Sequence, residues 1–204
     1  MNPQKVTSMR VSSRERIVEA ARSLFHRQGF EATSFSDIAR EAGIPRGNFY
    51  YHFKSKDELL LAVIERWQGY LREALQRIEA AAPDPLEQIR RMLRVPLEEA
   101  VTNVEYGCPL GSLVYELRKA EHPDEVRTQA VGLFDVLADW LAVRLEALGW
   151  TSEEARPMAL RLLSRLQGAI LLASAYEDPR LLQGEIDDLY DWVRTHTRKS
   201  QRDS

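Results

Sequence analysis

The chain has 204 residues, enough for one large domain or for a small module joined to a larger one. Apolar residues make up 44% and charged residues 29%, values typical of a globular protein and unlike those of a disordered chain. The single cysteine, Cys108, excludes an internal disulfide and a multi-cysteine zinc site. We expect a cytoplasmic protein, because there is no N-terminal signal sequence and no uncharged apolar stretch of about 20 residues.

Charge is distributed unevenly along the chain. The net charge is −3, but residues 1–60 hold ten Lys or Arg and seven Asp or Glu, whereas the remainder holds 18 and 24. A basic N-terminal part on an acidic body is expected when only the first part meets phosphate groups.

Apolar residues recur with a helical period along nearly the whole chain, and no long segment alternates as a strand would. The predicted fold class is therefore all-α. We expect about nine helices, over residues 12–29, 34–42, 47–53, 56–82, 85–104, 111–120, 123–149, 152–175 and 181–199.

Several residues mark helix ends. Three pairs have the spacing of capping boxes, namely Ser12 with Glu15, Ser34 with Asp37, and Ser55 with Glu58. Gly43 is expected to end the second helix in the left-handed conformation. Pro96 lies inside the predicted helix 85–104 and should kink or split it.

Residues 34–53 have the proportions of a helix-turn-helix motif. Gly43 permits the turn, Ala39 lets the two helices cross closely, and a small core is expected from Ile38, Ile44 and Phe49. The second helix carries an unusual number of hydrogen-bonding side chains: Arg46, Asn48, Tyr50, Tyr51 and His52. Arginine and asparagine can read base edges, and tyrosine and histidine can donate to phosphate oxygens.

This region resembles the DNA-binding domain of the tetracycline-repressor (TetR) family. The resemblance covers about residues 13–65 and rests on the stretches GFEATSFSDIA at 29–39, AGI at 42–44, GNFYYHF at 47–53 and SKDEL at 55–59. Members of that family are typically homodimeric repressors with a helical C-terminal domain that binds a ligand and forms the dimer. The resemblance therefore implies operator DNA, a second copy of the chain and a small-molecule inducer as partners.

The resemblance also assigns roles to single residues. Base reading falls to Arg46, Gly47 and Asn48. The other predicted DNA-contacting residues, mainly phosphate contacts, are Thr33, Ser34, Ser36, Tyr50, Tyr51, His52 and Lys56. Pro45 departs from the Ser or Thr cap that many members have, so the pose of Arg46 is less well defined.

Other interpretations of these residues remain open. One of Tyr50 and Tyr51 could pack on a neighbouring helix, and His52 could only cap its own helix. The charge of Lys54 could be merely solvated. Lys5 and Arg10 lie in a polar segment that could reach a minor groove as a basic arm or form an ordinary tail.

The sequence predicts four segments: a flexible arm over 1–11, a helix-turn-helix domain over 12–55, a ligand-binding and dimerisation domain over 56–199, and a tail over 200–204. The last two helices carry apolar stripes at helical spacing, which the resemblance assigns to the dimer interface: Ala155, Ala159, Leu162, Leu166, Ala169, Ile170, Ala173, Ile186, Leu189, Tyr190 and Val193. The alternative is that one chain buries these stripes by itself.

Large apolar and aromatic residues in the C-terminal domain are candidates for the wall of a pocket for a small apolar or aromatic inducer. They are Trp67, Tyr70, Leu71, Tyr106, Cys108, Leu110, Leu113, Leu117, Phe134, Leu137, Trp140 and Leu141. For any single one of them the simpler interpretation is that it is part of the core. The segment 107–113 resembles one in a subset of the family where some members sense electrophiles or oxidants through a cysteine, so Cys108 is either a reactive thiol or a small buried apolar group.

The sequence thus predicts a transcriptional repressor that a small molecule releases from its operator. The alternatives are a Cys108-based redox or electrophile sensor and a helix-turn-helix activator without a ligand. We expect neither an enzyme nor a metal or cofactor site, because no nucleophile–base pair, Gly-rich phosphate loop or metal-ligand spacing is present.

Overall fold

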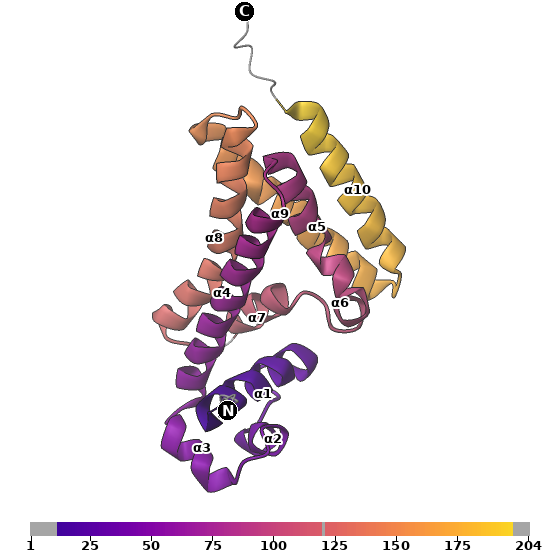
Figure 1. Ribbon diagram of the computed structural model, residues 1–204. Helices are drawn as coiled ribbons and strands as arrows, with labels where there is room; N and C mark the ends of the chain where they lie inside the picture. Colours follow the sequence, from indigo (N-terminus) through magenta and orange to yellow (C-terminus); the bar gives the residue numbers. More distant parts are fainter. Residues whose placement is uncertain (1–11, 120, 198–204) are drawn as a thin grey trace, which may run out of the picture. The chain divides into compact units, whose positions relative to one another are not determined.

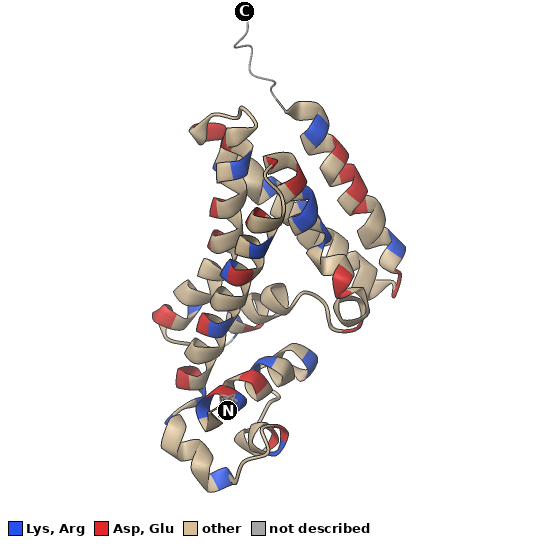
Figure 2. Ribbon diagram, in the orientation of Figure 1, with Lys and Arg blue, Asp and Glu red and all other residues tan. Residues whose placement is uncertain are grey.

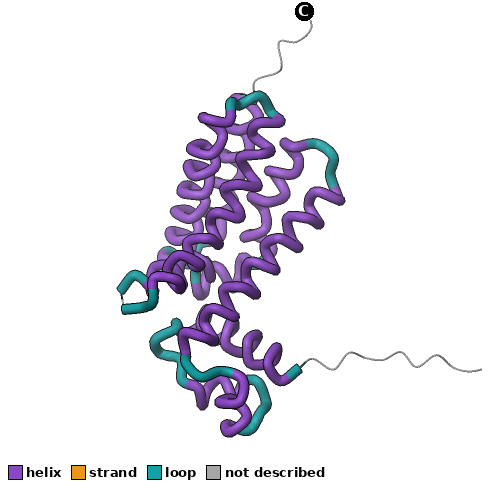
Figure 3. The backbone as a smooth tube through the Cα atoms, turned by 90° about the vertical axis from the view of Figure 1, so that its left-hand side faces the viewer, coloured by secondary structure: helices purple, strands orange, loops and turns teal. Residues whose placement is uncertain are grey.

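A computed structural model describes residues 12–119 and 121–197 (Figure 1). The predicted arm 1–11 with Lys5 and Arg10, and the tail 200–204, lie outside the described residues. Within them the chain forms helices and loops without any strand (Figure 3), so the predicted all-α fold is confirmed. The helices are α1 (Ser13–Gln28), α2 (Phe35–Glu41), α3 (Arg46–His52), α4 (Lys56–Ala81), α5 (Pro85–Glu98), α6 (Ala100–Tyr106), α7 (Pro109–Leu117), α8 (Asp124–Ala147), α9 (Ser152–Ala175) and α10 (Pro179–His196).

The helix predicted over 85–104 is two helices, which raises the number in the described residues from nine to ten. Helix α5 continues past Pro96 and ends at Glu98. The last carbonyls of a helix lack intrahelical partners, and the buried side chain of Asn103 donates to the Pro96 carbonyl at 2.8 Å. The side-chain amide of α6 thus satisfies the end of α5.

Two helices begin earlier than predicted because a proline occupies their first turn. Helix α7 starts at Pro109 and α10 at Pro179, each two residues before the predicted start. Proline suits the first helical position, since the amide hydrogen that it lacks would have no intrahelical partner there.

The chain divides into two compact units, Met1–Val63 and Ile64–Ser204, and the division falls within α4. The core of the first unit is built from α1, α2, α3 and the start of α4, and its fully buried side chains include Ile17, Ile38, Phe49, Phe53, Leu59 and Leu60. The core of the second unit is formed mainly by α5, α8, α9 and α10. Helix α9 packs against both α8 and α10.

Helix α9 is long and apolar enough to cross a membrane, judged by length and composition alone; its most apolar 18 residues have a mean hydropathy of 1.2. Of that window 39% is buried inside the unit. Core helices commonly meet the same criteria, so a single such helix is weak evidence for a membrane span.

Candidate nucleic-acid interface

The turn between α2 and α3 is fixed by two backbone hydrogen bonds. The amide of Ile44 donates to the Ala39 carbonyl at 3.0 Å, and the amide of Gly43 donates to the Arg40 carbonyl at 3.2 Å. This is the Schellman pattern, and Gly43 has the left-handed φ of +62° that it requires. The predicted end of the second helix is confirmed, and the turn sets the direction in which α3 leaves.

Helix α3 starts at Arg46 without a side-chain cap, as expected from Pro45. The φ of Pro45 is −60°, and its carbonyl accepts the amide of Asn48 at 2.9 Å. A ring-locked residue therefore replaces the usual capping hydroxyl at the start of the helix.

One aromatic residue decides which face of α3 points inward. Phe49 is fully buried, and its ring centroid lies 4.4 Å from that of Phe35 and 6.0 Å from that of Phe53, which is also fully buried. Because residues two apart on a helix lie on nearly opposite sides, an inward Phe49 leaves Gly47 and Tyr51 facing away from the core.

The side of α3 turned away from the core is exposed to solvent. Arg46, Gly47, Asn48 and Tyr51 are exposed, and Tyr51 retains 81% of its accessible surface. A Cβ atom added to Gly47 would meet no atom within 4 Å, so nothing in the chain itself requires glycine there. Glycine in a helix costs about 0.5–1 kcal/mol relative to alanine, so the base-reading role expected for Gly47 stays a prediction that the open position permits.

Helix α3 itself carries no acidic side chain. No Asp or Glu occurs between Glu41 and Asp57, whereas Arg46, Lys54 and Lys56 lie in that interval. Figure 2 accordingly shows α3 without acidic residues. A polar, aromatic and acid-free helix suits contact with a polyanion.

Tyr50 and Tyr51 behave differently. The Tyr50 ring packs edge-on against Phe35 and Phe49, with centroids 5.8 Å away in both cases, and 46% of the residue is exposed. Tyr51 contacts only the half-buried His52 ring among the aromatic groups described, at 5.1 Å. Tyr50 is thus the packed tyrosine, while a DNA contact by its hydroxyl, by Tyr51 or by His52 stays a prediction.

Lys54 is more than a solvated charge. Its ammonium group donates to the Tyr50 carbonyl at 3.0 Å, and its backbone amide donates to Glu58 at 2.7 Å. The Glu58 amide donates in turn to the Ser55 hydroxyl at 3.0 Å. The predicted capping box of Ser55 and Glu58 is therefore formed in part. The Glu58 carboxylate accepts from the amide of Lys54, which precedes the cap residue Ser55.

Thr33 and Ser34, two of the predicted DNA-contacting residues, form side-chain hydrogen bonds within the chain. Thr33 is 1% exposed, and its hydroxyl donates to the Gly29 carbonyl at 2.6 Å, so the prediction that its side chain meets a phosphate is corrected. The hydroxyl of Ser34 donates to the Asp37 carboxylate at 2.6 Å, and the pKa of Asp37 is lowered mainly by this bond. Ser34 is exposed but acts as the cap of α2, whereas Ser36 is exposed beside it.

Lys56 also has partners within its unit. Its ammonium group donates to the Glu31 carbonyl at 3.2 Å and lies 4.2 Å from the centroid of the Phe30 ring. Lys56 therefore joins the start of α4 to the loop after α1, and a phosphate would have to share the ammonium group with these contacts.

None of the predicted pocket residues lines the cavity found in the second unit. Leu110, Leu113, Leu117, Trp140 and Leu141 are buried in the protein core, and their predicted role in a pocket wall stays a prediction. The others are half-buried: Trp67, Tyr70, Leu71, Tyr106, Cys108, Phe134 and Leu137. A cavity of about 550 Å³ lies instead beside α6 and the loop from α9 to α10.

Trp140 is held by a polar network. Its indole donates to Glu79 at 2.7 Å, and the Arg144 guanidinium pairs with the same carboxylate. Arg144 lies 4.0 Å from the Trp140 ring centroid and also donates to Gln88 at 2.9 Å. The network ties the C-terminal end of α4 to α5 and α8, a role that a pattern of apolar residues could not reveal.

The predicted dimer-interface residues form the core of the second unit. All but Tyr190 are at most 7% exposed within one chain, so they have no surface left for a second chain: Ala155, Ala159, Leu162, Leu166, Ala169, Ile170, Ala173, Ile186, Leu189 and Val193. Tyr190 is half-buried and packs against the same core. The ten buried residues pack inside the chain, and the prediction that they contact a second subunit directly is corrected. The interface role of Tyr190 stays a prediction.

The other face of α9 carries exposed apolar and small residues. Leu160, Leu171 and Leu172 are 45%, 68% and 51% exposed. A Cβ atom added to Gly168 would meet no atom within 4 Å.

Across residues 12–119 and 121–197, no three His, Cys, Asp or Glu side chains are arranged to hold a metal ion.

The two-helix motif, its acid-free second helix and the separate helical unit define a helix-turn-helix DNA-binding regulator. Residues 17–63 match the model of the bacterial regulatory proteins of the tetR family, and residues 85–184 match that of the LmrA/YxaF-like transcriptional regulators' C-terminal domain. The chain belongs to the TetR family of transcriptional regulators.

Relatives span nearly the whole chain. An uncharacterized HTH-type transcriptional regulator in the lacX 3′ region of Lactococcus lactis is 32% identical over 86% of this chain and 90% of its own length. The HTH-type transcriptional regulator LmrA of Bacillus subtilis is 28% identical over 79% and 86%. The crystal structure of a TetR transcriptional regulator from Legionella pneumophila has a TM-score of 0.77 and 26% identity, covering 93% of this chain and 100% of that one. These relatives are named as regulators of transcription and not as enzymes.

Replacing Gly47 with Ala separates folding from DNA binding. Because the position is open, we expect the free energy of unfolding to rise by about 0.5 kcal/mol, while affinity for operator DNA falls about tenfold, or about 1.4 kcal/mol. Chemical denaturation and fluorescence anisotropy measure the two effects. Gly69→Ala on α4, where the added Cβ also meets nothing within 4 Å, serves as the control that keeps DNA affinity. Unchanged affinity in the Gly47 variant would show that no partner approaches this backbone.

Proposed function

We propose that the protein is a homodimeric, cytoplasmic repressor that grips operator DNA with α3 and releases it when a small apolar or aromatic molecule binds the C-terminal unit. The observation that carries the proposal is the exposed surface of Arg46, Gly47, Asn48 and Tyr51, which is held outward by the buried Phe49. Arginine and asparagine at the start of a recognition helix can contact base edges in the major groove.

Reading two half-sites requires two copies of α3 related by a two-fold axis, spaced about one DNA turn, roughly 34–36 Å. The exposed face of α9 is the surface that we propose for the second copy. Leu160, Ser164, Gly168, Leu171 and Ala175 recur there every three or four residues, opposite the buried stripe. The small residues among them would let two helices approach closely.

Release by a ligand requires two states with different ligand affinities. Helix α4 contains residues of both units, so a ligand that prefers one position of α4 would alter the separation of the recognition helices. The division derived from the sequence, with DNA binding over 12–55 and ligand binding and dimerisation over 56–199, is kept as part of this proposal.

The DNA-binding part is tested with Arg46→Ala. Fluorescence anisotropy should report tight, salt-sensitive binding of the unmodified protein to the DNA upstream of its own gene, with log affinity falling linearly with log salt. Loss of Arg46 should cost about 1–3 kcal/mol on that DNA and relax the sequence preference. Arg77→Ala removes an exposed charge from the second unit and should leave both properties intact. An Arg46 variant with unaltered affinity and preference would refute a base-reading role.

The dimer is tested with Leu171→Glu. A carboxylate on the exposed face of α9 should convert the dimer into a monomer by light scattering, without lowering the melting temperature of the chain by more than a few degrees. Val143→Glu introduces the same charge at a 57%-exposed apolar position of α8 and should leave the dimer unchanged. A Leu171 variant that remains dimeric would place the interface elsewhere.

Thiol sensing at Cys108 is a second candidate function. The half-buried sulfur caps α7, where it accepts the Gly111 amide at 3.5 Å. The thiolate would add to the carbon–carbon double bond of a maleimide, and the neighbouring carbon would take a proton from water. Mass spectrometry should find one adduct, lost in Cys108→Ser, together with weaker DNA binding by the modified protein. A thiol that stays unmodified, or an adduct that leaves DNA binding intact, would remove this candidate.

A further inference from the structure

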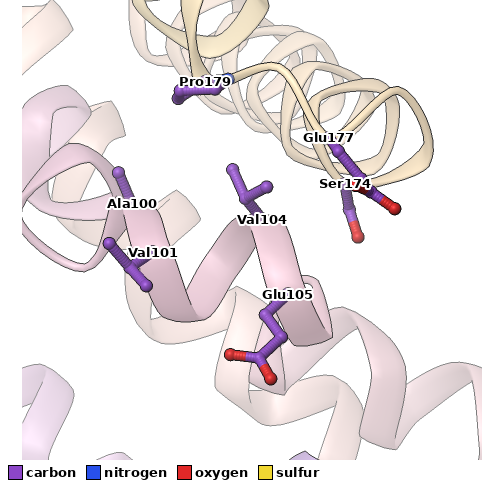
Figure 4. A pocket seen from close by; sticks show the side chains of 7 residues that line it. All are labelled: Ala100, Val101, Val104, Glu105, Ser174, Glu177 and Pro179. Atoms are coloured by element: carbon purple, nitrogen blue, oxygen red, sulfur yellow. The ribbon is translucent and has the colours of Figure 1, made fainter.

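The cavity of about 550 Å³ in the second unit lies between α6 and the segment that joins α9 to α10 (Figure 4). Its apolar lining comes from Ala100, Val101 and Val104 of α6 and from Pro179 at the start of α10. In Figure 4 the Val104 side chain points from α6 toward the segment that bears Pro179. The volume lies within the range of small-molecule pockets, about 300–1,000 Å³.

Two carboxylates border this apolar lining. Glu105 comes from α6, and Glu177 follows α9 together with the nearby hydroxyl of Ser174. Among the described residues, neither Glu105 nor Glu177 forms an ion pair or a side-chain hydrogen bond. Glu177 is held by its backbone, with a φ of +52° and an amide that donates to the Ser174 carbonyl at 3.2 Å.

The two stretches that supply the lining contain no cationic side chain. No Lys or Arg occurs over residues 95–117 or 166–179, the two stretches that supply the lining. The cations that flank these stretches are Arg94, Arg118, Arg165 and Arg180. Arg165 pairs with Glu185, and the guanidinium of Arg180 forms hydrogen bonds to both carboxylate oxygens of Asp178. This pairing lowers the pKa of Asp178 to about 2 and occupies Arg180.

We infer that this cavity is a binding site for a lipophilic organic cation. Such a molecule places its apolar groups on Val101, Val104 and Pro179 and its charge near Glu105 and Glu177. An organic anion of the same shape meets the same apolar lining with repulsive charges. The inference concerns binding alone; only an effect of the cation on DNA rests on the proposed repressor function.

The test uses two ions of matched shape and opposite charge. Isothermal titration calorimetry of the full-length protein, without DNA, should detect saturable binding of one tetraphenylphosphonium ion per chain. Tetraphenylborate should bind at least about tenfold more weakly. The preference should shrink in 0.5 M NaCl, because salt screens exposed charges. Equal binding of the two ions, or no saturable binding of the cation, overturns the inference.

Variants locate the site. Glu105→Gln with Glu177→Gln keeps the side-chain shape at both positions and should weaken cation binding about tenfold, whereas Glu73→Gln on an exposed part of α4 should not. Val104→Trp should fill the cavity and abolish binding, with circular dichroism and thermal melting establishing that the variant folds. Binding that is insensitive to these changes overturns the assignment. A Val104 variant with a changed oligomeric state in solution also overturns it, since the cavity would then be a contact between subunits.

The same protein preparation is assayed separately for operator binding. A protein that binds DNA but not tetraphenylphosphonium contradicts only the cation site. A protein that binds the cation but no DNA contradicts the proposed repressor and leaves the cation site standing.

Discussion

The burial of Phe49 is the constraint on which the DNA-binding surface depends. Helix α3 has seven residues and no side-chain cap, so it has little stability of its own. Packing of the Phe49 ring on Phe35, with Phe53 buried on the same face, provides its tertiary support. The same contact fixes the rotation of the helix, so one hydrophobic side chain determines which polar side chains face a partner.

Two residues at the ends of α3 restrain its backbone. Pro45 sets the backbone at its start, and Lys54 donates to the Tyr50 carbonyl near its end. Gly47 departs from this pattern, because it weakens the helix at a position where alanine would fit. A locally destabilising residue on an exposed helix face is consistent with the proposed contact with DNA.

The sequence predicted the fold class and the helix-turn-helix well because local rules govern both. Gly43 and the capping pair at Ser34 and Asp37 specify their helix ends within a few residues, regardless of tertiary packing. The starts at Pro109 and Pro179 could also have been found, since the preference of proline for a first turn applies to them. Thr33 was misassigned because a hydroxyl beside a motif can face either way, and only its bond to Gly29 decides.

The C-terminal unit was harder to predict because the helical period identifies an apolar face without identifying its partner. The stripe from Ala155 to Ala173 is the intrachain core, while the opposite face of α9 keeps exposed leucines and Gly168. The cavity escaped prediction for a similar reason. Its lining combines α6 with residues some 70 positions later, and Val104 and Glu177 carry no local signal that joins them.

The central claim is that α3 enters the major groove and is presented twice by a symmetric pair of subunits. Footprinting with dimethyl sulfate tests it directly, because the reagent methylates guanine N7 in the major groove. On the operator, the protein should protect guanines in two stretches whose centres lie about one helical turn, roughly 34–36 Å, apart or a multiple of it. Protection of a single stretch would contradict the account. So would protection confined to adenine N3, the minor-groove atom that the same reagent methylates.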